Sequence, residues 1–159
     1  MIRNPKDQAV SWCHFASGIQ RNSDAYKEMY PKDWNKFLRS YIAGEQFVST
    51  KPGEWYPDHI LSWYKHRGDG NVMFVYYEDL IKDFKSTVQR IAKFVNTNLL
   101  DDEIERIANE TSFASMKIQA QPREIGDWKN HFTVAQSEQM DSLIANKLAR
   151  TDINFVYEL

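Results

Sequence analysis

The chain has 159 residues, the length of one ordinary domain, and 42% of them are hydrophobic, which is enough for a sizeable core. Its formal net charge of −2 excludes the overall basic field that carries non-specific nucleic-acid binding, its single Cys13 excludes an internal disulfide or a multi-cysteine metal site, and no apolar run reaches membrane-spanning length. We therefore expect a single domain over residues 1–159 that is soluble and cytoplasmic, with no nucleic-acid or membrane partner.

The first predicted element is a helix that begins at Pro5, with Asn4 as its N-cap and Asp7 in its first turn. Gly18 weakens or ends this helix, and Ser11 lies beside its apolar stripe. The stripe follows three- and four-residue steps and comprises Ala9, Trp12, Cys13, Ala16 and Ile19.

Two further helices precede residue 70. The spacing of apolar side chains predicts one from Trp34 to Ile42, and Gly44 follows at the position of a C-terminal stop. The other is predicted within "WYPDHILSWYKHR", and the turn-rich "RGDGN" ends it.

One strand is predicted, from Val72 to Tyr77 in "NVMFVYY". A continuous apolar run without polar alternation implies that both faces are covered, as in parallel sheets, and such a strand needs neighbours to satisfy its backbone. Within the chain, "MIR" is the one candidate neighbour, as the last residues of a second strand. We therefore expect these residues to form part of a larger α/β domain.

The rest of the chain is predicted to be mainly helical. Phe84 to Val95 form the clearest amphipathic helix, "DDEIERIA" begins another, and Thr111 is predicted to cap a short helix through "SFASMK". A last helix precedes the terminal extended segment "TDINFVYEL" and faces the core with Met140, Leu143, Ile144 and Leu148.

Candidate binding residues lie near the start of the chain and after the predicted strand. Arg3 stands where a strand would end and a helix begin, and its planar guanidinium suits phosphate oxygens that Ser11 could share. Tyr77 would emerge at the carboxyl end of the strand, and "ETSFASM" offers hydroxyls, a ring and a thioether that suit a purine. The alternative is equally simple: a surface arginine, a serine on a helix, a core tyrosine and ordinary caps.

A second candidate region runs from Gly126 to Glu138. Gly126 permits a tight turn, Asp127 is expected to cap it, and Trp128 is expected to bury a large surface. A short extended patch follows that leads into a helix and could pair with its own copy across a two-fold axis, although the residues alone favour an ordinary turn. The patch is marked by Lys129, Thr133, Val134 and Glu138.

No motif predicts a metal site or a catalytic group within the chain. The histidines are scattered without a second ligand type at metal spacing, so we expect them to be satisfied or exposed; they are His14, His59, His66 and His131. The "GDG" at Gly68 to Gly70 lacks the spacing and the lysine of a phosphate loop, and no Ser-His-Asp or Cys-His arrangement stands out.

Taken together, these stretches resemble the cytosolic sulfotransferases, which transfer a sulfuryl group from 3′-phosphoadenosine-5′-phosphosulfate (PAPS) to a hydroxyl or amine of a small-molecule acceptor. The resemblance covers Arg3 to Leu159 and rests on "RNPKDQAVSWCHF", "GEWYPDHILSWYKHR", "VMFVYYEDLIKDF", "TSFASM", "GDWKNHFTVAQSE" and "FVYEL" in this order. It implies the C-terminal half of a P-loop-type, three-layer α/β fold that is helix-rich, with one or two parallel core strands.

The resemblance also implies roles for single residues. Arg3 and Ser11 match the residues that hold the 3′-phosphate, and Tyr77 matches a tyrosine near the adenine. The segment that wraps the nucleotide contains Thr111, Ser112, Phe113 and Met116. The family's dimer motif, Lys-Thr-Val-Glu, is matched at every defined position, which replaces the ordinary-turn reading and implies a homodimer through Lys129, Thr133, Val134 and Glu138.

The sequence also departs from the family. Similar proteins begin with a strand and a Tyr-Pro-Lys-Ser-Gly-Thr-Thr-Trp loop that grips the 5′-phosphosulfate, and they later supply a histidine base; both precede the point where this sequence starts. Where the family has Arg-Lys-Gly before "GDW", this chain has Gln121, Pro122 and Arg123, and Arg123 is the candidate replacement for the phosphate-binding arginine. We therefore expect no catalytic residue within the chain and no turnover by the chain alone.

Two other interpretations stay open. The chain could be an inactive, truncated paralogue that binds adenosine 3′,5′-bisphosphate or dimerises, rather than part of an active enzyme. A related P-loop kinase fold is a further alternative, which "GDWKNHFTV" argues against.

Overall fold

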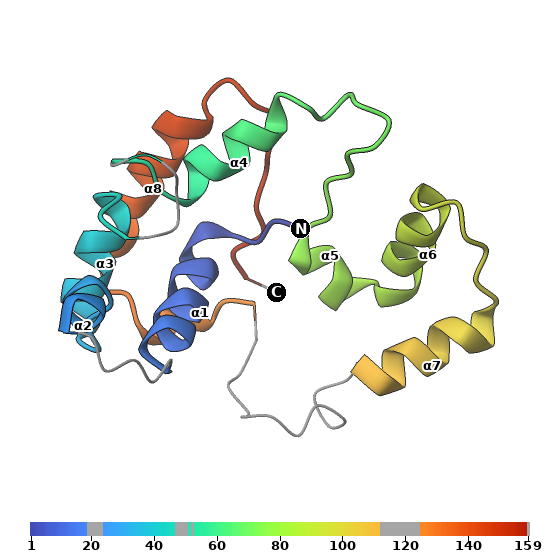
Figure 1. Cartoon of the computed structure of the whole chain (residues 1–159), viewed down its shortest axis with the longest axis horizontal. Helices are drawn as coiled ribbons and strands as arrows, with labels where there is room; N and C mark the ends of the chain where they lie inside the picture. The colour runs from blue at the N-terminus through green and yellow to red at the C-terminus, as the bar shows by residue number, and fades with distance from the viewer. Residues whose placement is uncertain (19–23, 47–50, 52, 112–124, 159) are drawn as a thin grey trace. The chain divides into compact units, whose positions relative to one another are not determined.

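The computed structural model describes residues 1–18, 24–46, 51, 53–111 and 125–158 (Figure 1). The described residues fall into two compact units, one within Met1–Arg3 and Gly70–Pro122 and the other within Asn4–Asp69 and Arg123–Leu159. The expectation of a single domain stays a prediction, and each unit is described by itself below.

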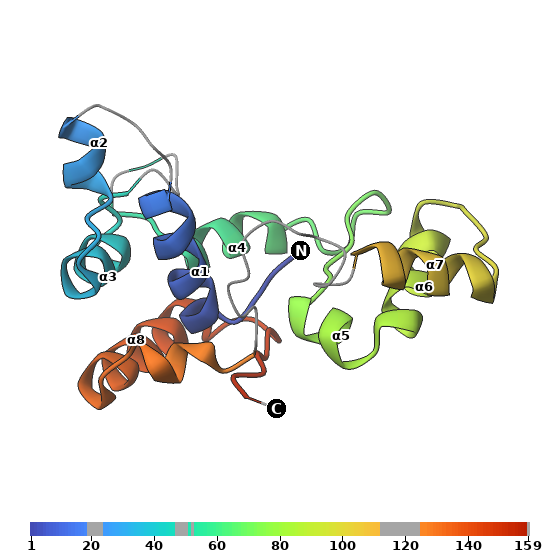
Figure 2. The ribbon, with the colours of Figure 1, turned by 90° about the horizontal axis from the view of Figure 1, so that it is seen from below.

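The larger unit is a packed group of helices. Its elements are α1 (Pro5–Gly18), α2 (Asp24–Met29), α3 (Trp34–Ile42), α4 (Tyr56–Tyr64), the 3₁₀ helix η1 (Asp127–Asn130) and α8 (Val134–Leu148). The helix α1 packs against α3, α8 and η1, and α4 packs against α8 (Figures 1 and 2). The core between them is formed by Ala9, Ala16, Phe37, Tyr41, Trp55, Ile60, Met140 and Ile144.

The helix ends of this unit follow from their sequence. Asn4 caps α1, because its Oδ1 accepts a hydrogen bond of 2.8 Å from the backbone N–H of Asp7. The predicted stop at Gly44 is confirmed: its φ is 68°, and an added Cβ would lie 2.4 Å from the backbone carbon of Gly53. The short helix α2 was not predicted.

The smaller unit contains α5 (Tyr77–Lys82), α6 (Phe84–Phe94) and α7 (Asp101–Thr111). The helix α6 packs against both α5 and α7. Asp83 caps α6 by accepting a hydrogen bond of 3.1 Å from the Ser86 N–H, and the Glu103 side chain accepts one of 2.8 Å from the Leu100 N–H before α7. The helix predicted from Phe84 and the acidic first turn predicted for α7 are confirmed, but Phe94 and Val95 of the predicted apolar face are exposed.

The predicted strand is reduced to a single point of pairing. Tyr76 forms a parallel bridge with Ile2, in which the Ile2 N–H donates to the Val75 carbonyl and the Tyr77 N–H donates to the Ile2 carbonyl, both at 2.8 Å. The pairing predicted for "MIR" is therefore present. The run is not covered on both faces, however, because Val75 is its only buried residue, and Tyr77 begins α5 instead of ending a strand.

None of the helices in the described part of the chain is both long and apolar enough to cross a membrane.

Candidate functional site

Arg3 and Tyr77 lie side by side in the smaller unit. The bridge between Ile2 and Tyr76 holds the two residues that follow it next to each other, and the Arg3 Cζ lies 4.5 Å from the centroid of the Tyr77 ring. Stacking on an aromatic face holds a guanidinium in place. Its N–H groups then point outward in the plane of the guanidinium, where they can donate hydrogen bonds to an anion. The structure thus brings together two of the residues predicted to bind the nucleotide.

The other predicted nucleotide residues are placed differently. Ser11 is exposed on α1, in the larger unit. Thr111 is the last residue of α7, and its hydroxyl donates a 2.7 Å hydrogen bond back to the Ile107 carbonyl. The short helix that Thr111 was predicted to cap, through "SFASMK", lies outside the described residues. The remaining predicted residues lie outside the described ones and are Ser112, Phe113, Met116 and Arg123.

The first turn of α1 contains a buried cation that sequence reasoning missed. Lys6 is only 3% exposed, and its Nζ donates to Ser137 Oγ and Asp141 Oδ2 of α8, both at 2.7 Å. The same Nζ lies 4.2 Å from the Trp128 ring and 5.2 Å from the Tyr157 ring. In the sequence, Lys6 is one charged residue in a helix turn, and no local signal indicates partners more than a hundred residues away.

Asp7 is the buried anion of the same turn. Its carboxylate accepts hydrogen bonds from the Asn4 side chain at 2.7 Å and from the backbone N–H groups of Gly126 and Trp128, both at 2.9 Å. Gly126 adopts the tight turn predicted for it, with a φ of 97°. Lys6 and Asp7 therefore attach the start of α1 to α8 and to η1.

The residues of the predicted dimer motif lie along η1 and the start of α8. The predicted patch does lead into a helix, but of its four residues only Thr133, the N-cap of α8, has an extended backbone. Lys129 belongs to η1, and Val134 and Glu138 already lie in α8. The Val134 side chain is 76% exposed, and Glu138 is also exposed. Trp128 is half-buried, and Asp127 accepts a 2.9 Å hydrogen bond from the Asn130 side chain within the turn.

Two of the four histidines meet between α1 and η1. The rings of His14 and His131 are 5.4 Å apart, and His131 Nε2 lies 3.5 Å from an Asp127 carboxylate oxygen. Burial and the neighbouring His131 lower the pKa of His14, while Asp127 opposes that change. Burial raises the pKa of the Cys13 thiol to about 11, so it is a poor nucleophile at neutral pH.

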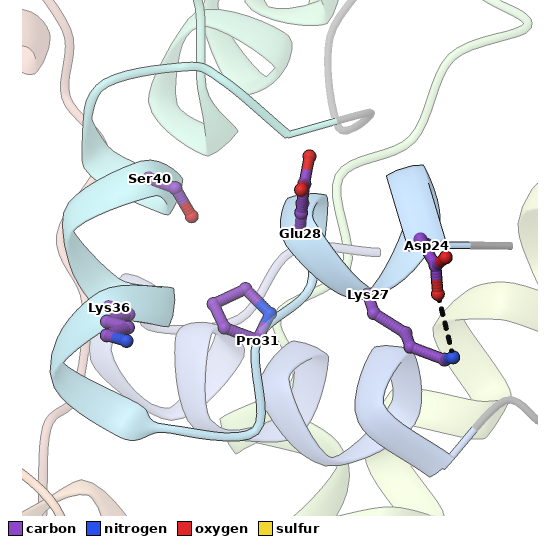
Figure 3. A pocket seen from close by; sticks show the side chains of 6 residues that line it. All are labelled: Asp24, Lys27, Glu28, Pro31, Lys36 and Ser40. Carbon is purple, nitrogen blue, oxygen red and sulfur yellow. Dashed lines mark hydrogen bonds and ion pairs between the residues drawn. The ribbon is translucent and has the colours of Figure 1, made fainter.

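A polar pocket of about 580 Å³ opens between α2 and α3 (Figure 3). It is lined by two carboxylates, two ammonium groups, a proline and a hydroxyl: Asp24, Glu28, Lys27, Lys36, Pro31 and Ser40. Lys27 and Asp24 pair with each other at 3.0 Å (Figure 3). The pocket contains none of the residues predicted to bind the nucleotide, and its balanced, exposed charges favour no particular ligand.

Comparison with known sequences gives a consistent result. The sequence profile of the sulfotransferase domain matches residues 1–152. The chain is 35% identical to sulfotransferase 6B1 of Danio rerio over 165 residues, which cover 96% of this chain and 52% of that protein. It is 32% identical to sulfotransferase 1C2 of Rattus norvegicus over 179 residues, which cover 100% of this chain and 57% of that protein. The chain thus spans about half the length of these curated relatives.

Solved structures show the same likeness. The mouse sulfotransferase SULT7A1, complexed with PAP, superimposes with a TM-score of 0.79 at 30% identity and covers 95% of this chain and 58% of its own. Retinol dehydratase, in complex with androsterone and the inactive cofactor PAP, gives a TM-score of 0.75 at 22% identity. The match covers 97% of this chain and 48% of that one, and at this identity it supports the fold alone. The predicted fold class, a helix-rich part of the sulfotransferase fold, is confirmed.

Proposed function

The chain belongs to the sulfotransferase family, and from this premise we propose that it carries the adenosine 3′-phosphate side of a PAPS-binding site. The observation that carries the proposal is the Arg3 guanidinium stacked on the Tyr77 ring, 4.5 Å from its centroid. The guanidinium is planar and permanently charged and can donate paired hydrogen bonds to phosphate oxygens, and an aromatic ring can stack on an adenine.

The chain offers donors of the chemical types that such a nucleotide needs. Arg3 supplies a half-buried cation, and Ser11 supplies an exposed hydroxyl on α1. We assign Arg3 and Ser11 to the 3′-phosphate and Tyr77 to the adenine, and we keep Thr111, Ser112, Phe113, Met116 and Arg123 as the proposed nucleotide-wrapping residues. PAPS supplies the sulfuryl group, which passes to a hydroxyl or amine of a small-molecule acceptor.

The proposed assignment is tested by calorimetry with two nucleotides. Adenosine 3′,5′-bisphosphate should bind more tightly than adenosine 5′-monophosphate, because only the former carries the 3′-phosphate. Arg3→Ala should weaken binding of the bisphosphate by about tenfold or more, since hydrogen bonds to charged groups contribute about 1.5–3 kcal/mol, and it should leave the monophosphate nearly unchanged.

The matched control is Arg67→Ala. Arg67 also stacks on a tyrosine, with its Cζ 4.2 Å from the Tyr64 ring centroid, but no role in binding is proposed for it. This variant should bind both nucleotides as the parent chain does. Absence of heat with the bisphosphate, or equal loss in both variants, would contradict the assignment.

For the chain alone, we propose binding without turnover. Sulfuryl transfer needs a general base and cations or amides that stabilise the leaving phosphate. The sequence contains no glycine-rich phosphate loop with a lysine, and none of its histidines stands in a catalytic arrangement. We place these functions in other parts of an active sulfotransferase. A reducing, cytoplasmic location fits the lone, buried Cys13.

We also propose that the chain forms a homodimer through Lys129, Thr133, Val134 and Glu138. The supporting observation is Val134, a large apolar side chain that is 76% exposed in the first turn of α8. A basic residue precedes it and an acidic residue follows it, so two copies related by a two-fold axis could bring opposite charges together around the paired valines. Association through this segment also suits the alternative that the chain acts as a nucleotide-binding or dimerising module.

A further inference from the structure

The C-terminal tail, residues 156–158, lies against η1 within the larger unit. The Asn4 side chain donates to the Val156 carbonyl at 3.2 Å, and the Trp128 indole N–H donates to the Tyr157 carbonyl at 2.8 Å. A Cβ added to Gly126 would lie 3.5 Å from the same Tyr157 oxygen. These contacts involve the backbone of the tail, so they fix its path without help from the Glu158 side chain.

This path brings Glu158 to Lys129. The Lys129 ammonium contacts a carboxylate oxygen of Glu158 in the same chain, with 51% and 67% of the two side chains exposed. The hydrogen bond and the charge of Lys129 lower the pKa of Glu158, so the carboxylate is ionised throughout the neutral range.

Lys129 is also the cation of the proposed dimer motif, where it would meet Glu138 of the second copy. With Glu158 beside it, the local charge is close to zero, and an approaching Glu138 meets a second carboxylate. We propose that Glu158 competes within the chain for Lys129, so that the tail weakens dimerisation through the Lys129–Glu138 segment. This inference rests on the dimerisation proposed above.

The test is the dimer dissociation constant of Glu158→Gln, measured by sedimentation equilibrium over a series of concentrations. The variant keeps the size of the side chain and the backbone contacts of the tail but removes the competing charge. Because a two-fold interface contains each pair twice, we expect about three- to tenfold tighter dimerisation. High salt should reduce the difference between the variant and the parent chain.

Glu54→Gln is the matched control, because it removes the same charge from another ion pair of the chain. In that pair Lys51 Nζ lies 3.9 Å from a Glu54 carboxylate oxygen, and 76% and 34% of the two side chains are exposed. It should leave the dimer unchanged, which excludes a general effect of net charge. Val134→Glu should abolish the dimer if the proposed segment forms the interface.

The outcomes separate the two proposals. Suppose that Val134→Glu disrupts the dimer while Glu158→Gln dimerises as tightly as the parent chain or more weakly. The proposed competition by the tail is then wrong, and the proposed interface is supported. If Glu54→Gln tightens the dimer as much as Glu158→Gln, the competition is also wrong. If the parent chain and Glu158→Gln are both monomeric at every concentration, the proposed dimer fails, and the inference fails with it.

Discussion

Asp7 shows how a single carboxylate can define the position of a helix. In the sequence it suits the first turn of α1, where a negative charge opposes the macrodipole. In the structure Asp7 is 1% exposed, and its carboxylate accepts hydrogen bonds from the backbone N–H groups of Gly126 and Trp128. These residues lie 119 and 121 positions further along the chain. A single sequence gives no local signal for such distant partners, so the burial of this carboxylate was not predictable from it.

At this scale we predict that Asp7→Asn destabilises the larger unit by about 2–4 kcal/mol. The amide replaces one accepting oxygen with an NH₂ group that faces buried donors, which leaves at least one of them unsatisfied. Urea denaturation would measure the loss. Asp24→Asn, which affects an exposed pair with Lys27, should change stability by less than about 0.5 kcal/mol, and equal effects of the two variants would contradict the prediction.

At the scale of elements, the start of α8 depends on a reciprocal cap. Thr133 Oγ1 accepts a 3.2 Å hydrogen bond from the Gln136 N–H, and Gln136 Oε1 accepts a 3.0 Å hydrogen bond from the Thr133 N–H. The Gln136 side chain also donates to Asn35 Oδ1 of α3 at 2.7 Å. The cap therefore defines where α8 begins and links it to α3.

We predict that Thr133→Ala lowers the free energy of unfolding by about 1 kcal/mol, because the orphan N–H of the first turn loses its acceptor. Thr133→Ser should restore most of the loss, since it keeps the accepting hydroxyl. Thermal denaturation of the three proteins would measure the effect. A serine variant as unstable as the alanine variant would show that the methyl group, and not the cap, is responsible.

The helices were predictable where apolar spacing and end signals agree, as in α1, α3, α6 and α7. The sequence predicts an extended patch from Lys129 to Glu138 that leads into a helix, whereas α8 already begins at Val134, after the capping box that Thr133 and Gln136 form. The strand was overestimated for another reason: the run from Val72 to Tyr77 has strand composition, but a strand also needs pairing partners, and in the described chain only Ile2 supplies a bridge.

The candidate site, like the fold, was predictable only in part. The position of Arg3 after a short extended segment and of Tyr77 after an apolar run indicated two residues at one edge, and the bridge between Ile2 and Tyr76 does place them together. The roles of Lys6 and Asp7 depend on packing between distant segments, for which residue type and spacing give no rule.

At the scale of the whole molecule, the two units differ in how much apolar surface each buries. In the larger unit, α1 alone has five buried apolar residues, namely Pro5, Ala9, Val10, Cys13 and Ala16. In the smaller unit, the buried helical residues are Glu78, Thr87, Ala92 and Ile104, and several large apolar side chains are exposed, namely Ile81, Phe94, Val95 and Leu100. Local stability follows buried apolar contact, so the two units should open with different free energies.

We therefore predict that, in the absence of nucleotide, backbone amides in α5, α6 and α7 exchange hydrogen with solvent faster than those in α1, α3 and α8. Mass spectrometry of peptides after timed exchange in deuterated buffer would measure this, with the unfolded chain in urea as the reference for intrinsic rates. The exchange should proceed from local opening of the smaller unit, which requires little apolar surface to be exposed. The central residues of α6 and α1 give the sharpest comparison, because hydrogen exchange at the middle of a helix does not report fraying of its ends. Equal protection at these two positions would mean that the smaller unit opens only when the whole chain unfolds.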